Sequence, residues 1–463
     1  MFCAEYNGIL YGMNYIKTKK RGLGYNATFS VAFGFFVAIL VGSLLLYLPI
    51  CQSGEYPIKY VDALFTATTS VCVTGLVTVP TFSAWSTLGH IVITILIEVG
   101  GLGVVTFMIV LITNLGGKVG LKESIMIQTA YNVDRKKDMV KVVYKTLIGA
   151  LVVQMVGALL YMIVFVPEFG LRGIWISIFN SVSGFCNAGM DIIGPDSLIP
   201  YQSNLLINIV TSLLIVLGGI GFPIWWFTLS YLKERDWKKH IPISVRIVLT
   251  STLILIFGGA LLILLFEYNN PDTIGNLPFG DKVLVSIFQS VTTRTAGFAT
   301  VAQEKLRMST VVLCSVLMFI GGSPSGTAGG IKTTTLVIVF ATVISIVMDR
   351  DETVIFRRKI NAGTVRQAFA IFMFSLTVMI VGLTLLCVVC PGNLADCLYE
   401  IASAIGTVGL TRALTPGLST AGKYIVIATM YLGRIGPITL SIFFGKDRLG
   451  NKLRYAEESV NVG

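Results

Sequence analysis

The stretch Ile405-Gly-Thr-Val-Gly409-Leu410 interrupts an apolar region with small and polar residues and places a glycine near its end. Three other stretches of the chain are built in the same way. The four glycines follow one another at intervals of 114, 108 and 112 residues, and this regular spacing indicates four internal repeats of one structural unit. The other three stretches are Ser70-Val-Cys-Val-Thr-Gly75-Leu76, Gly184-Phe-Cys-Asn-Ala-Gly189-Met190 and Thr293-Arg-Thr-Ala-Gly297-Phe298.

A short amphipathic segment precedes each glycine and holds fewer than the roughly 20 helical residues that cross a bilayer. We interpret each as a half-helix of one to two turns that dips into the membrane, turns at the small residues and returns extended. Backbone at membrane depth must be buried in protein or face water, and carbonyl groups around a water-filled axis coordinate dehydrated cations. The segments are residues 65–71, 179–184, 288–293 and 399–404.

The composition places the rest of the chain in a membrane. Of the 463 residues, 54% are hydrophobic and 13% charged, whereas a soluble domain carries about 25% charged residues. Eight apolar blocks are long enough to span a bilayer, although one is broken in the middle. They cover residues 27–50, 88–113, 147–166, 205–232, 247–266, 310–348 (the broken block), 369–389 and 424–444.

We therefore predict an all-α membrane protein with eight transmembrane helices, arranged as four span–pore-loop–span repeats around a pseudo-fourfold axis. The sequence has no Walker-type phosphate loop and no spacing typical of a catalytic triad, so we expect neither an enzyme nor an organic cofactor. The predicted repeats cover residues 27–115, 145–233, 246–349 and 366–445, between cytoplasmic termini at 1–26 and 446–463.

The basic residues predict the orientation. They produce a net charge of +11 and gather in five segments that share one side of the membrane if the spans alternate. Because an excess of Lys and Arg marks cytoplasmic loops, we expect both termini in the cytoplasm, no cleavable signal peptide and no binding of nucleic acid. The segments are residues 17–21, 118–145, 233–246, 350–366 and 446–454.

The residues around each repeat glycine are the candidate ion ligands of a selectivity filter. Glycine permits the left-handed or extended backbone that keeps successive carbonyl groups pointing inward. Two of the stretches, in the first and last repeats, are similar to the Thr-Val-Gly core of potassium channel filters. The predicted ligands are Val73, Thr74, Gly75, Asn187, Ala188, Gly189, Thr295, Ala296, Gly297, Thr407, Val408 and Gly409.

The broken block carries five glycines and one proline between Met318 and Gly330. A continuous helix there would lose about 1 kcal/mol per glycine and about 3 kcal/mol for the proline. We predict a loop at membrane depth, just below the filter and lining the ion path; the alternative is an extramembrane loop between two full spans. The loop comprises Gly321, Gly322, Ser323, Pro324, Ser325, Gly326, Thr327, Ala328, Gly329, Gly330, Ile331 and Lys332.

Arg434 in the last block and Lys332 in the loop are charges that lipid would exclude, at a cost of roughly 2.5–3.5 kcal/mol each. We predict that Arg434 faces the ion path as a gate element, because a fixed positive charge raises the barrier for a cation. The alternative is a structural pair with Glu98. A third charge, Arg294 beside the third filter strand, is expected to anchor its half-helix to a carboxylate, and the candidates are Asp62, Asp191 and Glu400.

Taken together, these motifs resemble the Trk/Ktr/HKT superfamily of potassium transporters, with the bacterial Ktr-type pore subunit as the nearest group. The resemblance covers about residues 27–445, although Glu98 departs from the neutral Gln expected of the family. It implies that the 321–332 loop restricts passage and that Arg434 faces the pore beside it. The motifs that carry it are residues 69–76, 98–103, 288–298, 321–335 and 406–410.

The resemblance also implies uptake of K⁺ across the cell membrane (the bacterial inner membrane) by a multi-pass homodimer, driven by the inside-negative potential. The dimer would rest on a ring of cytosolic nucleotide-binding regulatory subunits of the RCK type. Coupling to Na⁺, as in a symporter, is left open. A sodium-preferring relative is an alternative that Gly75 disfavours, since sodium-preferring plant relatives carry Ser there. A transporter of organic solutes, the other alternative, would show two inverted halves.

Overall fold

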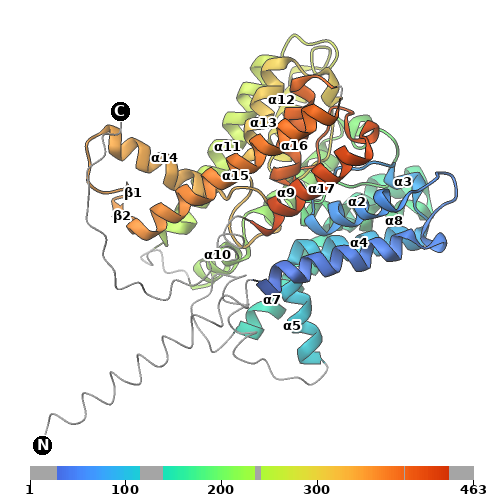
Figure 1. Cartoon of the computed structure of the whole chain (residues 1–463), viewed down its shortest axis with the longest axis horizontal. Helices are drawn as coiled ribbons and strands as arrows, with labels where there is room; N and C mark the ends of the chain where they lie inside the picture. The colour runs from blue at the N-terminus through green and yellow to red at the C-terminus, as the bar shows by residue number, and fades with distance from the viewer. Residues whose placement is uncertain (1–28, 115–138, 235–240, 391, 437–463) are drawn as a thin grey trace, which may run out of the picture.

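The computed structural model describes residues 29–114, 139–234, 241–390 and 392–436, and these are mostly helical (Figure 1). The predicted basic segments 17–21 and 446–454 lie outside the described residues, as do most of 118–145, the middle of 233–246 and the end of the last apolar block. The helical fold confirms the all-α prediction.

Four helices among the described residues are long and apolar enough to cross a membrane. They match the first predicted span of each repeat, and many of their large hydrophobic side chains are exposed, as expected for helices that face lipid. The four are Phe29–Tyr47, α7 (Met139–Phe169), α11 (Ile243–Glu267) and α15 (Ala362–Val389).

The other four apolar blocks are broken or short. Gly103 separates α4 (Thr87–Leu102) from α5 (Val104–Asn114), so the continuous helix predicted over 88–113 is wrong. The helix predicted over 205–232 is also broken, because α9 (Leu205–Gly219) and α10 (Phe222–Glu234) meet at 98°. Gly103 and Gly221 have φ of +89° and +96°, which end a right-handed helix and which glycine adopts without strain.

The break predicted in the block 310–348 matches the structure. The helices α13 (Met308–Phe319) and α14 (Thr333–Val347) flank it, and at 1.5 Å per residue they are only about 18 and 22 Å long. The last block yields α17 (Thr420–Ile435), which ends before Gly436.

The helices before the repeat glycines are longer than predicted. They hold 13, 16, 14 and 13 residues, or about 20–24 Å, instead of one to two turns, yet they remain too short to cross a bilayer. Their first turns mix apolar and charged residues, and in three of them an acidic residue stabilises the helix N-terminus. These short helices are α2 (Tyr60–Cys72), α8 (Leu171–Cys186), α12 (Phe279–Thr292) and α16 (Leu394–Gly406).

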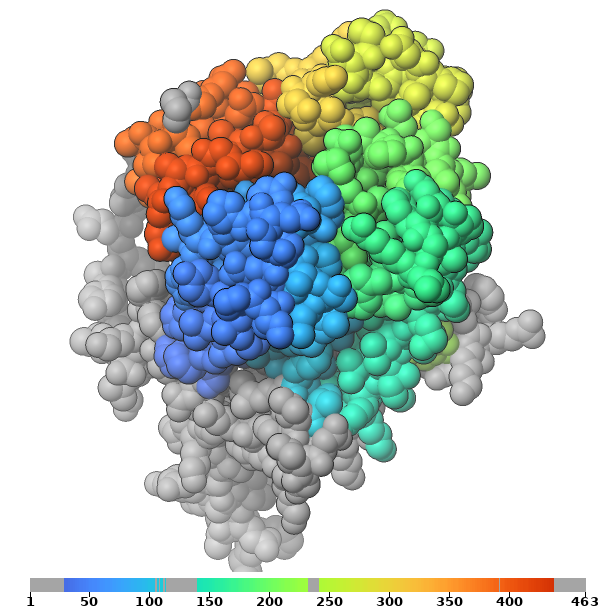
Figure 2. All heavy atoms as spheres, turned by 90° about the vertical axis from the view of Figure 1, so that its right-hand side faces the viewer, coloured from blue at the N-terminus to red at the C-terminus, as the bar shows by residue number. Residues whose placement is uncertain are grey.

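The helices pack in a closed ring. Each short helix contacts the apolar helix that follows the preceding short helix: α4 contacts α8, α9 contacts α12, α13 contacts α16, and α17 returns to α2. Figure 2 shows the result from one end, where the blue, green, yellow and red segments of the chain follow one another around a central hollow.

Small elements complete the described structure: α3 (Thr81–Ala84), the 3-10 turns Pro49–Cys51, Ile199–Tyr201, Gln303–Lys305 and Thr415–Gly417, and an antiparallel hairpin of β1 (Val354–Ile355) and β2 (Arg358–Lys359).

A buried ion pair joins the two ends of this ring. Lys423 Nζ of α17 lies 2.6 Å from Asp62 Oδ1 in the first turn of α2, and the two side chains are only 16% and 8% exposed. The Thr78 hydroxyl donates to the same carboxylate oxygen at 3.0 Å. The pair therefore fixes the last helix of the ring against the first.

Replacing Lys423 with Met is expected to destabilise the protein by about 3–5 kcal/mol, because it leaves the Asp62 carboxylate buried without a cation. The matched control is Lys359→Met, whose partner Glu352 lies in an exposed pair and whose loss should cost no more than about 1 kcal/mol. Unfolding of the detergent-solubilised variants measures both. Equal losses in the two variants would contradict this role for the Asp62–Lys423 pair.

Candidate functional site

The four repeat glycines lie side by side although the sequence separates them by more than a hundred residues. A β-carbon added to any one of them would collide with a backbone carbonyl oxygen of the next repeat, and the fourth contact returns to the first. We call Gly75, Gly189, Gly297 and Gly409 the glycine ring. The added β-carbons would lie 2.5 Å from Ala188 O, 2.3 Å from Ala296 O, 2.3 Å from Val408 O and 2.3 Å from Thr74 O, respectively.

The backbone around the ring repeats an unusual conformation four times. The ring glycines have φ of +101°, +63°, +86° and +101° in chain order, and the residues two positions earlier also have positive φ. Non-glycine residues seldom adopt such angles. Left-handed residues therefore alternate with ordinary ones in the same way in all four repeats. The non-glycine residues are Val73 (56°), Asn187 (60°), Thr295 (67°) and Thr407 (52°).

A hydroxyl side chain near the end of each short helix holds the strand that follows it. In the first and last repeats the hydroxyl oxygen accepts the ring glycine's own N–H at 2.9 Å, and in the middle repeats the hydroxyl donates to the carbonyl of the residue after the glycine. The sequence analysis missed these residues, although a Ser or Thr recurs five or six positions before each glycine. They are Thr69, Ser183, Thr292 and Ser403.

The ring opens on one side into a cavity of about 210 Å³. All four ring glycines line it, together with the residue two positions after each of them. Asp191 is the one ionisable residue among the described residues that line this cavity. A cation in the cavity can therefore reach the carbonyl groups of all four strands.

The loop 321–332 packs against the ring from the other side. A β-carbon on Gly329 would lie 2.1 Å from Thr407 Oγ1, so the loop backbone touches a residue just below the ring. Ile320 and Ile331 form a parallel β-bridge that closes the neck of the loop. More than half of the loop residues are buried, which favours the predicted loop inside the protein, and its depth in the membrane stays a prediction.

The loop is seated in the break between α9 and α10. The N–H groups of Ser323 and Thr327 donate to the carbonyl oxygens of Gly219 at 3.0 Å and Gly218 at 3.1 Å, respectively. In return, the Phe222 N–H at the start of α10 donates to the Ser325 carbonyl at 3.0 Å. The bend between α9 and α10 was not predicted, yet it supplies the backbone hydrogen-bond partners of the predicted loop 321–332.

Arg434 bridges the loop to the first repeat. Its guanidinium group donates to the carbonyl oxygens of Thr327 in the loop and Gly100 in α4. The predicted alternative, a pair with Glu98, is wrong, because the Glu98 carboxylate contacts the Cys186 thiol at 3.7 Å instead. The arginine stands where the other repeats carry the second glycine of a Gly-Gly pair, namely Gly101, Gly219 and Gly322.

The first glycine of each pair allows its helix to pack closely against the short helix of the same repeat. A β-carbon on Gly100, Gly218 or Gly433 would lie 2.0, 1.9 or 2.2 Å from a carbonyl oxygen at the end of the short helix in the same repeat. Small residues allow such close approach between helices of membrane proteins. In the third repeat the equivalent Gly321 meets the Gly329 carbonyl within the loop.

The other two cations singled out from the sequence contact neutral groups. Lys332 Nζ donates to the Ala328 carbonyl at 2.7 Å, within the loop itself. Arg294 donates to Thr252 Oγ1 of α11 at 3.4 Å, and in the described part of the chain no ion pair joins it to a carboxylate. The predicted anchor to Asp62, Asp191 or Glu400 is therefore wrong. Its side chain lies beside Gly322, away from those carboxylates, in a small pocket between α9, α11 and α12.

Comparison with known proteins gives a consistent result. The family model described as "Cation transport protein" (TrkH) matches residues 18–451. The chain is 38% identical to "Ktr system potassium uptake protein B" of Bacillus subtilis, over 94% of this chain and 96% of that protein. It is 37% identical to "Potassium/sodium uptake protein NtpJ" of Enterococcus hirae, over 94% and 96%.

The fold is similar to a solved structure as well. The crystal structure of the potassium transporter TrkH from Vibrio parahaemolyticus matches with a TM-score of 0.71 and covers 91% of this chain and 85% of that one. The two sequences are 17% identical, so this likeness concerns the fold alone.

Replacing Ser403 with Ala is expected to destabilise the protein by about 1–3 kcal/mol, because the buried Gly409 N–H loses its acceptor. Ser403→Thr is the matched control, since it keeps the hydroxyl and the first repeat carries Thr69 at the equivalent position. Thermal unfolding in detergent compares the two. Equal unfolding temperatures for the alanine and threonine variants would contradict a stabilising role for the hydrogen bond between Ser403 and Gly409.

Proposed function

The chain belongs to the TrkH family of cation transport proteins, a family of membrane ion transporters, and from this premise we propose that it takes up potassium ions into the cell. Its relatives are named as potassium or potassium/sodium uptake proteins. The observation that carries the proposal is the glycine ring, because it brings backbone carbonyl groups of four repeats to one point. Carbonyl groups in such a ring replace the hydration shell of a cation.

The proposed architecture has eight membrane spans in four repeats around a pseudo-fourfold axis, with the boundaries expected from the sequence. Each repeat consists of a long helix, a short helix with its strand, and a second apolar helix that is broken or short. The contacts from α4 to α8, α9 to α12, α13 to α16 and α17 to α2 support this arrangement. Long helices that cross the membrane and short ones that enter it halfway would put the ring at membrane depth.

In the proposed selectivity filter, ions pass between the four strands and bind their carbonyl oxygens in single file. The alternating backbone conformation supports this role, since it is the same in all four repeats. The Ser and Thr clamps would keep the ring from collapsing around a smaller ion. The filter residues are those expected from the sequence: 73–75, 187–189, 295–297 and 407–409.

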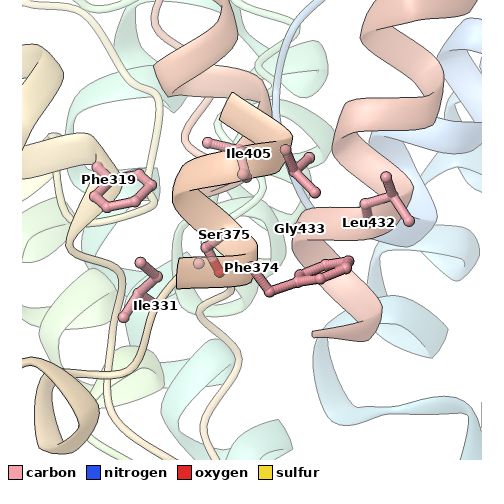
Figure 3. Close-up of a pocket in the computed structure, with 9 residues that line it drawn as sticks. Phe319, Ile331, Phe374, Ser375, Ile405, Leu432 and Gly433 are labelled. Carbon is pink, nitrogen blue, oxygen red and sulfur yellow. The ribbon is translucent and has the colours of Figure 1, made fainter. Parts of the chain in front are cut away.

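The loop 321–332 and Arg434 form the proposed gate below this filter. The loop lies against Thr407, and Arg434 ties it to the first repeat through Thr327 and Gly100. Figure 3 shows a small, largely apolar pocket behind the loop, with Phe319 and Ile331 on one side and Leu432 of α17 on the other. This pocket is no larger than about one water molecule, so withdrawal of the loop from the ion path would require the surrounding helices to move as well.

The direction of transport follows from the membrane potential. A potential of 100 mV is worth about 2.3 kcal/mol per elementary charge, so an inside-negative membrane draws K⁺ inward through an open path. With both termini in the cytoplasm, as the basic segments favour, the cavity outside the ring faces the exterior. We further propose a homodimer bound to a ring of cytosolic regulatory subunits.

Sodium is the second candidate ion, because one similar relative is named a potassium/sodium uptake protein. Gly75 favours potassium, since the first-repeat position carries Ser in sodium-preferring plant relatives. Coupling of K⁺ to Na⁺ movement in this chain is part of the same question. Fluxes of both ions in proteoliposomes distinguish uptake of potassium, uptake of sodium and coupled movement of the two.

Purified protein in liposomes is expected to conduct K⁺ in preference to Na⁺, and Gly409→Ser is expected to reduce that preference about tenfold, equivalent to about 1.4 kcal/mol. The added side chain would collide with the Thr74 carbonyl at a φ of +101°. Gly258→Ser in α11 is the control, because nothing lies within 4 Å of its β-carbon. Absence of K⁺ flux in the unmodified protein, or unchanged selectivity in Gly409→Ser, would overturn the proposal.

Replacing Arg434 with Gln is expected to raise the K⁺ flux about tenfold, because each charge-assisted hydrogen bond to the loop and to α4 is worth about 1.5–3 kcal/mol. Arg434→Lys separates two causes: it keeps the positive charge but loses the two-pronged geometry. A flux that rises in both variants indicates a mechanical latch, whereas a rise in the Gln variant alone indicates an electrostatic barrier. Flux in Arg434→Gln at or below that of the unmodified protein argues against the gate.

A further inference from the structure

The cavity outside the glycine ring is electrically asymmetric. The residue two positions after each ring glycine lines it, and in three repeats that residue is uncharged: Val77, Ala299 and Thr411. The second repeat supplies Asp191 at the same position. A carboxylate at one of four equivalent positions has no role in the symmetric filter, so its presence beside the ion path needs another explanation.

Asp191 also differs from the nearby Asp62 and Asp396 in its partners. Asp62 pairs with Lys423 and Asp396 with Arg412, at 2.6 and 2.7 Å, so a cation of the protein neutralises each. Glu400 accepts hydrogen bonds from the Thr411 and Thr415 hydroxyls and forms no ion pair among the described residues, but it does not line the cavity. Asp191 lies near the Ser197 hydroxyl and the Ile193 N–H, and within the described residues no Lys or Arg forms an ion pair with it. Its negative charge is therefore available to a mobile cation.

The surroundings of Asp191 raise its pKa but leave the carboxylate largely charged near neutral pH. Asp191 lies in the loop between α8 and α9, outside the membrane-spanning helices, and its side chain is half-buried. Burial raises the pKa of Asp191 to about 6, so the carboxylate is still largely ionised at pH 7.5. A charge in a cavity with low-dielectric walls acts on an ion more strongly than the same charge in bulk water.

We propose that the Asp191 carboxylate is an outer binding site for a hydrated monovalent cation, which concentrates K⁺ at the entrance of the filter. The inference rests on the proposed transport function and deepens it. The cation keeps its water in this cavity, where Gln303 and Thr411 offer further oxygen atoms, and loses it only at the ring. The site thus sets the external K⁺ concentration at which uptake is half-maximal, and the filter sets selectivity.

The test compares Asp191→Asn with Asp196→Asn in proteoliposomes at pH 7.5. Asp196 lies in the same loop and is exposed, so its variant removes the same charge from outside the cavity. At low ionic strength, Asp191→Asn is expected to raise the KM for external K⁺ about three- to tenfold and to change the maximal flux less than about twofold. Asp196→Asn is expected to leave both values unchanged.

The salt dependence of KM is a second measurement, because a purely structural role of Asp191 would not respond to salt. Choline chloride at about 1 M reduces the Debye length to about 3 Å, so the difference in KM between Asp191→Asn and the unmodified protein should shrink. Asp191→Glu should restore a low KM. Equal KM values for Asp191→Asn and the unmodified protein, a salt-independent difference, or an equal effect of Asp196→Asn would each overturn the inference. No K⁺ flux in the unmodified protein would instead refute the proposed function.

Discussion

Backbone segments of four repeats contact one another at the glycine ring, and the surrounding helices are arranged around these contacts. At the glycine ring, the carbonyl oxygen of one repeat occupies the place where a side chain on the next would begin. Polar backbone groups at membrane depth are tolerated only where they are bonded or face water. One Ser or Thr side chain in each repeat bonds a backbone group of the strand, and in the proposed filter the remaining carbonyl groups would bind the ion.

The third and fourth repeats each differ from the others in one feature, and these two features form the proposed gate. In the third repeat a loop replaces the short break of the second helix, and it seats itself in the break of the second repeat. In the fourth repeat Arg434 replaces the second glycine of the Gly-Gly pair and reaches both the loop and the first repeat. The filter needs four similar strands, whereas a gate needs one element that differs and another that holds it.

The repeat itself could be predicted because its requirements are local. Glycine is the residue that accepts positive φ without strain, so the spacing of four glycines marked the four strands, and the proline and glycines at 321–330 marked a helix that could not continue. The breaks at Gly103 and Gly221 were missed because a glycine inside an apolar block is equally typical of close helix packing. The lengths of the short helices were underestimated because charged residues in their first turns, such as Asp62 and Asp281, interrupt the apolar pattern.

The sequence by itself indicated a membrane protein, the recurring ring glycines and the interrupted helix, because composition, spacing and backbone preference can be taken directly from the order of the residues. Only the tertiary structure decided the partners: Arg434 with Thr327 and Gly100 rather than Glu98, Arg294 with Thr252, Lys423 with Asp62, and Asp191 facing the cavity. These contacts join residues up to 361 positions apart. A buried charge takes whichever polar group the packing of other helices brings near it, and no local pattern encodes that choice.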